Sequence, residues 1–136
     1  MRNEINSIPL TSLPQCLIIN MDHSNNPGTH WTSLFITHDC CIYFDSFGLK
    51  PPNEITHFLD RNRATGIQGT AIDRHCSATD RHGSDTDRHR YFNTFPIQSP
   101  DDVTCGHYSI YLLFKLSNCH EKFYNILNEL YETKLN

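Results

Sequence analysis

The stretch NNPGTHWTSLFITHDCCIYFDSFG, residues 25–48, decides the fold because it encodes two strands and the short turn between them. Trp31–Thr37 is dense in aromatic and β-branched residues, a pattern typical of a strand. A two-residue break follows, and Cys40–Asp45 then resumes the pattern. A turn rich in Asn, Pro and Gly over Asp22–Thr29 precedes both segments. We therefore predict two antiparallel strands joined by a tight turn.

The flanking segments add strands and a helix to this pair. The apolar run Leu17–Ile19 follows a proline and predicts a buried strand, so that three strands form an antiparallel meander. Tyr91–Ile97 is a further aromatic, strand-like run. Asn53 is expected to cap a helix over Glu54–Leu59, whose apolar residues fall on one face.

The C-terminal part of the chain predicts two more helices. Gly106–Leu116 is apolar nearly all round, which is typical of a central, buried helix. Glu121–Leu135 has apolar residues at helical spacing and predicts an amphipathic helix on the outside of the core. The pattern therefore predicts an antiparallel meander of strands, one buried central helix and one outer amphipathic helix.

Length and charge limit the class of protein. The 136 residues suffice for one domain, which we expect to be a monomer. The net charge of −4 gives no support for nucleic-acid binding. The longest apolar run, Tyr108–Leu116, is too short to span a membrane, and Met1–Leu10 lacks the apolar core of a signal peptide. We therefore expect a soluble, intracellular protein.

Six cysteines with irregular spacing and no secretion signal predict reduced thiols rather than a disulfide framework. Residues 64–90 have almost no large apolar side chain, and the motif Asp-Arg-His recurs there every seven residues. Such a segment cannot bury enough surface to order itself, so we predict a disordered insert. Its regularly spaced histidines are His75, His82 and His89. We expect them to be solvated, and we predict no metal site.

Cys105 lies directly before the apolar helix and is a candidate nucleophile. The free N–H groups at a helix start stabilise negative charge, and the thiolate is the reactive form of cysteine. Gly106 leaves room for a substrate backbone to approach the sulfur. The alternative is an ordinary buried cysteine, since such residues are common.

Three other residues fit the needs of such a nucleophile. His30 opens a strand and is a candidate to exchange protons with the thiol. Asp45 ends the neighbouring strand, where it can hold the imidazole in one tautomer. Gln98 can donate its amide N–H to a developing oxyanion, together with the backbone N–H of Cys105. Each of the three also has a structural alternative, as a turn or loop residue.

The motifs GTHW, YFDSFG and IQSPDDVTCGHY together resemble the signature of the adenovirus-type (adenain-like) cysteine proteases, which share an architecture with SUMO- and ubiquitin-like-specific proteases. The sequences of the first two motifs are especially similar to those of proteases from Polinton (Maverick) transposons and large DNA viruses. The spacing of seven from Gln98 to Cys105 fits the adenovirus type and is one residue longer than in the SUMO-specific type.

The resemblance implies an α+β fold, in which a central helix that carries the cysteine packs on a small, mainly antiparallel sheet, with outer helices. It also implies hydrolysis of peptide bonds through a thioester intermediate. It implies that Cys105 attacks, His30 acts as general base and acid, Asp45 orients His30, and Gln98 stabilises the oxyanion. Trp31 would form a wall beside the histidine. Substrates of such enzymes are capsid and core precursors, often cut after small residues such as glycine.

Two alternatives remain open beside a capsid-processing endopeptidase. The same residues would serve an isopeptidase that removes a ubiquitin-like modifier. An inactive relative that acts as a binding module is also open, because only Met1–Pro14 precedes the first strand and the segment 64–90 is foreign to the family. We assign no cofactor. Adenovirus protease is helped by a peptide and by DNA, but the acidic charge does not support DNA here.

Overall fold

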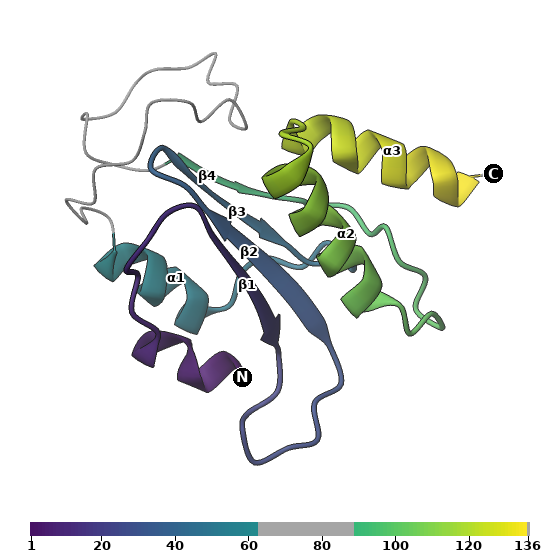
Figure 1. Cartoon of the computed structure of the whole chain (residues 1–136). Coiled ribbons are helices and arrows are strands. Elements are labelled where there is room, and N and C mark those ends of the chain that lie inside the picture. The colour runs from purple at the N-terminus through teal and green to yellow at the C-terminus, as the bar shows by residue number, and fades with distance from the viewer. Residues whose placement is uncertain (63–88, 136) are drawn as a thin grey trace.

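A four-stranded sheet lies at the centre of the computed structural model, with helices on both of its faces (Figure 1). The structure describes residues 1–62 and 89–135. The elements in chain order are η1 (Arg2–Ser7), β1 (Gln15–Asn20), β2 (Trp31–Ile36), β3 (Cys40–Phe44), α1 (Asn53–Arg61), β4 (His89–Phe92), α2 (Cys105–Asn118) and α3 (Phe123–Leu135). The class is α+β, with a mixed sheet.

The strands lie in the order β1-β2-β3-β4, and the first three form the predicted antiparallel meander. Ser33 pairs with Phe44, so the start of β2 and the end of β3 lie next to each other. β4 is parallel to β3, with Cys40 opposite His89. The prediction of a strand over Tyr91–Ile97 is therefore wrong in its bounds. β4 begins earlier, at His89, inside the segment 64–90 predicted to be a disordered insert. It ends at Phe92, which pairs with Tyr43 near the end of β3.

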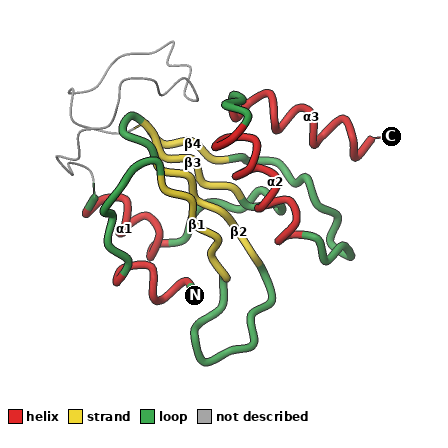
Figure 2. The backbone as a smooth tube through the Cα atoms, viewed as in Figure 1, coloured by secondary structure: helices red, strands yellow, loops and turns green. Residues whose placement is uncertain are grey.

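Two apolar cores fill the space between the sheet and its helices. Because side chains alternate along a strand, Phe35 of β2 faces one core while Leu34 and Ile36 face the other. The core under α2 and α3 contains Phe35, Ile42, Phe44, Ile97, Leu112, Leu113, Leu116, Phe123, Ile126, Leu127 and Leu130. The core under η1 and α1 contains Ile5, Leu10, Ile19, Leu34, Ile36, Tyr43, Ile55, Phe58 and Leu59. Figure 2 shows the sheet between these two helical layers.

Helix α1 buries the face that the sequence predicts, with Ile55, Phe58 and Leu59 inside. The expected cap is wrong, however. The N-cap position is occupied by Pro52 in an extended conformation, and no side chain caps the helix. Asn53 already belongs to the first helical turn, so its side chain is past the position from which it could cap.

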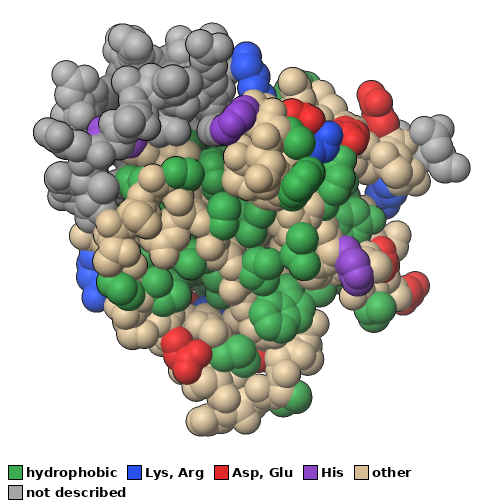
Figure 3. All heavy atoms as spheres, in the orientation of Figure 1, with side chains coloured by type: hydrophobic (Ala, Val, Ile, Leu, Met, Phe, Trp, Pro, Cys, Tyr) green, Lys and Arg blue, Asp and Glu red, His purple; other side chains and the backbone are tan. Residues whose placement is uncertain are grey.

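Helix α2 is not buried all round, in contrast to the prediction. Ile110 and Phe114 are 58% and 54% exposed, because α2 packs on the sheet along one side only. Figure 3 shows apolar side chains gathered on the face that β1, β2 and α2 present. Within the described residues, no helix is long and apolar enough to cross a membrane.

The cysteines follow the prediction only in part. Cys16, Cys105 and Cys119 are free thiols. Cys40 is disulfide-bonded, so the expectation of reduced thiols is wrong for this residue. Sequence spacing does not reveal a pairing of this kind, because a disulfide requires the two Cα atoms to lie close together in the fold. His75 and His82 lie outside the described residues.

We predict that Gly48→Ala destabilises the protein by about 1–3 kcal/mol or more, since Gly48 has φ +72° and a Cβ there would lie 2.6 Å from the backbone carbon of Phe95. Urea denaturation measures this free energy of unfolding. Gly106→Ala is the matched control, because its Cβ would lie 3.9 Å from Trp31 in ordinary contact. The control should be neutral or gain up to about 1 kcal/mol from helix propensity. Equal stability of the Gly48→Ala chain and the wild type would contradict the strained turn.

Candidate active site

His30 lies immediately before β2, where the connection from β1 fixes its backbone. Its carbonyl oxygen accepts a hydrogen bond of 2.8 Å from the backbone N–H of Met21. Both ends of the connection contact Asn20, because Asn20 Oδ1 accepts a bond from the N–H of Asp22 and Gly28 packs against the Asn20 side chain. Gly28 has φ +86°, and a Cβ there would lie 2.3 Å from that side chain, so the position strongly favours glycine.

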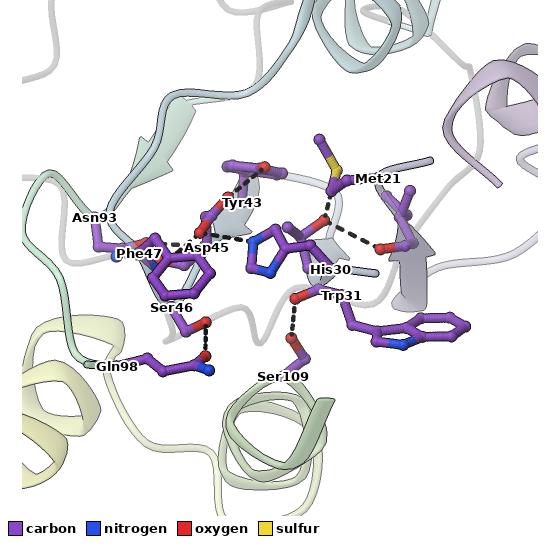
Figure 4. A network of polar contacts seen from close by, with 12 residues as sticks. Met21, His30, Trp31, Tyr43, Asp45, Ser46, Phe47, Asn93, Gln98 and Ser109 are labelled. Carbon is purple, nitrogen blue, oxygen red and sulfur yellow. Dashed lines mark hydrogen bonds and ion pairs between the residues drawn. The ribbon is translucent and has the colours of Figure 1, made fainter. Parts of the chain in front are cut away.

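Asp45 follows β3 and holds the imidazole of His30. Its Oδ1 lies 3.0 Å from His30 Nε2, and its side chain is only 1% exposed (Figure 4). The same oxygen accepts a bond of 2.8 Å from the backbone N–H of Phe47, and Oδ2 accepts one of 3.5 Å from the hydroxyl of Tyr43. Burial and the charge of Asp45 raise the pKa of Tyr43, so this hydroxyl stays a donor.

Cys105 is the first residue of α2, and its side chain lies near the imidazole of His30. This proximity helps to raise the pKa of His30. Nε2 is occupied by Asp45, so Nδ1 is the ring nitrogen left for the sulfur. Nδ1 is buried and has no hydrogen-bond partner among the described residues. In enzymes, hydrogen bonds between nucleophile and base are often long or poorly aligned before substrate binds.

The pKa of His30 is raised in this environment. Burial opposes the charged imidazolium, but the hydrogen bond and charge of Asp45, followed by those of Cys105, outweigh it. The raised pKa favours the charged imidazolium form of His30 next to Cys105.

Ser109 and Trp31 connect the cysteine helix to the histidine strand. The Oγ of Ser109, one helical turn after Cys105, donates a bond of 3.3 Å to the carbonyl oxygen of Trp31. The indole of Trp31 lies over Gly106, 3.9 Å from the position a Cβ would take there. Gly106 therefore lies beside the indole of Trp31 and stays partly exposed, and Trp31 is 41% exposed near the candidate nucleophile.

Gln98 is buried and attached to both halves of the site. Its Oε1 accepts a bond of 2.6 Å from the hydroxyl of Ser46, the residue after Asp45. Its Nε2 donates to the backbone carbonyl of Asp102, in the turn that leads to Cys105. The carboxylate of Asp102 in turn accepts bonds from the N–H and the hydroxyl of Thr104. The amide of Gln98 thus lies between the Asp45 turn and the start of α2.

The sequence analysis did not identify three further residues that shape the site. Asn93, buried after β4, accepts a bond of 3.1 Å from the N–H of Asp45 and donates one of 2.6 Å to its carbonyl oxygen. The ring of Phe47 lies against the imidazole of His30, with centroids 4.8 Å apart. Ser46 holds Gln98. Ser46 and Phe47 stand beside Asp45 in the motif YFDSFG, whereas no local signal marks Asn93.

Across residues 1–62 and 89–135 there is no group of His, Cys, Asp and Glu side chains that could hold a metal ion. Neither the protein-family models nor the curated proteins contain a match to this chain. The chemical argument therefore depends on the geometry of His30, Asp45, Gln98 and Cys105.

We predict that Asp45→Asn lowers the pKa of His30, because it removes the charge that raises it. A folded-state pKa above the unfolded value of about 6.5 stabilises the protein fully below that pH, and the contribution is lost as pH rises through the folded pKa. Asp45→Asn should thus cost more free energy of unfolding at about pH 6 than at about pH 9. NMR titration of His30 and urea denaturation at both pH values measure these effects.

The matched control is Asp39→Asn, which removes a carboxylate 3.2 Å from the exposed ring of His38. Its cost should depend little on pH, because exposed pairs contribute little to stability. An unchanged His30 titration in Asp45→Asn would refute the pairing of Asp45 with His30.

Proposed function

We propose that the protein is a cysteine endopeptidase of the adenovirus protease type. The observation that supports this most directly is the arrangement around His30, with the Asp45 carboxylate bonded to Nε2 and Cys105 close enough to affect the pKa of the ring. Cysteine proteases combine sulfur, imidazole and carboxylate in this way. A histidine with a merely structural role would not need a cysteine thiol near its ring.

In the first half of the proposed reaction, His30 Nδ1 takes the proton of Cys105 and the sulfur attacks the carbonyl carbon of the scissile peptide bond. The carbonyl oxygen becomes an oxyanion, stabilised by the backbone N–H of Cys105 and the second amide hydrogen of Gln98. The C–N bond then breaks, and the leaving amine takes the proton from His30. A thioester remains on Cys105.

In the second half, His30 removes a proton from water and the hydroxide attacks the thioester carbonyl. The C–S bond breaks, the acid product leaves, and His30 and Cys105 return to their starting state. Asp45 stays ionised and supports the imidazolium in both halves. Each half therefore uses one proton shuttle and one oxyanion site.

The fold supports the same assignment. A helix that begins with the cysteine packs on a sheet that carries the histidine and the acid, as in the shared architecture of adenovirus and SUMO proteases. We propose capsid or core precursors of a virus or transposon as substrates, which would place the enzyme in the cytoplasm or nucleus of a host cell. Trp31 and Gly106 would line the substrate path beside Cys105.

We predict that the purified protein cleaves fluorogenic peptides that end in Gly-Gly before the reporter, and that Cys105→Ala lowers the rate by a factor of about 10⁴ or more. Thiol alkylation should block the wild type. Cys119→Ala is the matched control, since Cys119 is an exposed free thiol, and its rate should equal that of the wild type. Cleavage that survives Cys105→Ala would exclude Cys105 as the nucleophile.

The same assay separates the alternative functions. An isopeptidase would release SUMO- or ubiquitin-derived reporters faster than the short peptides. A binding module would cleave neither substrate, and its Cys105 would react with the alkylating reagent no faster than Cys119. Either result would overturn the endopeptidase proposal.

A further inference from the structure

Ser46 has no part in the proposed bond-breaking steps, yet its side chain is fully buried next to the candidate acid. Its hydroxyl donates a bond of 2.6 Å to Oε1 of Gln98. Its carbonyl oxygen accepts bonds of 2.8 and 2.9 Å from the backbone N–H groups of Ile97 and Gln98. Ser46 therefore binds Gln98 through both its backbone and its side chain.

The orientation of the Gln98 amide follows from its two partners. The carbonyl oxygen of Asp102 can only accept, so the group that faces it must be the NH₂. The amide oxygen then faces Ser46, whose hydroxyl must act as donor. Figure 4 shows the oxygen of Gln98 directed to Ser46 and its nitrogen on the other side. One amide hydrogen is used by Asp102, and the second is left over.

We propose that Ser46 is a positioning residue, which holds the Gln98 amide so that its nitrogen faces the start of α2. The inference rests on the proposed function, in which the second amide hydrogen of Gln98 donates to the oxyanion. It also links the two halves of the site, since Asp45 orients His30 while the next residue along the chain orients Gln98. Without the Ser46 hydroxyl, Oε1 of Gln98 is buried without a donor and the amide loses one of its two anchors.

A double-mutant cycle on peptide cleavage tests this role. Gln98→Ala should lower kcat about 10²–10³-fold through loss of an oxyanion donor. Ser46→Ala should lower kcat about 10- to 100-fold through a misplaced donor, with KM unchanged because the interaction forms only in the transition state. The double variant should be no slower than Gln98→Ala alone. Losses that multiply, or an unchanged kcat in Ser46→Ala, would overturn the proposal.

The matched control is Ser33→Ala, another fully buried serine, whose hydroxyl has no hydrogen-bond partner among the described residues. It should leave kcat unchanged.

A second measurement does not depend on activity. In the Cys105→Ala background, the side-chain ¹H–¹⁵N resonances of Gln98 should shift in Ser46→Ala and stay in place in Ser33→Ala. If the wild type cleaves nothing, the proposed function fails, and the Ser46 assignment is still decided by these resonances. Gln98 resonances that ignore Ser46→Ala would refute the assignment even in an active enzyme.

Discussion

The hydrogen bond between the Asp45 carboxylate and Nε2 of His30 is the interaction on which the rest of the site depends. A carboxylate that is almost wholly buried needs donors, and Asp45 has the ring, the N–H of Phe47 and the hydroxyl of Tyr43. Because Nε2 is bonded to Asp45, Nδ1 is the ring nitrogen that remains for another partner. One hydrogen bond therefore helps to raise the pKa of the imidazole and also fixes which of its nitrogens stays available.

That bond in turn requires Asp45 to be fixed beyond the end of its strand. The ladder between β3 and β4 ends at Tyr43 and Phe92, so no strand neighbour is left for the backbone of Asp45. The side chain of Asn93 takes this place, because it accepts from the N–H and donates to the carbonyl of Asp45 as a peptide group would. The sheet is thus extended by one side chain, at the position where the carboxylate must be held.

Local patterns predict the elements whose cause is local. The β2–β3 hairpin follows from two strand-forming runs around a short turn, and α1 and α3 follow from apolar residues at helical spacing. The rest depends on tertiary contacts. His89 and Arg90 belong to the repeat in sequence and form a strand only because they pair with β3. The sequence predicts Ile110 in the core, but it is 58% exposed. Asn93 and the disulfide of Cys40 likewise have no signature without the fold.

In the candidate site, the register of the β2–β3 hairpin predicts that His30 and Asp45 lie close together. Their distance to Cys105 instead depends on how α2 lies along β2. A slip of α2 by one turn, about 5.4 Å, would carry the thiol away from the ring. Ser109 opposes such a slip, because it stands one turn after Cys105 and bonds to Trp31, the residue after His30. Cys105 and Ser109, on one face of α2, are thus matched to His30 and Trp31 at the start of β2. The hydrogen bond between Ser109 and Trp31 fixes the register that keeps Cys105 near His30.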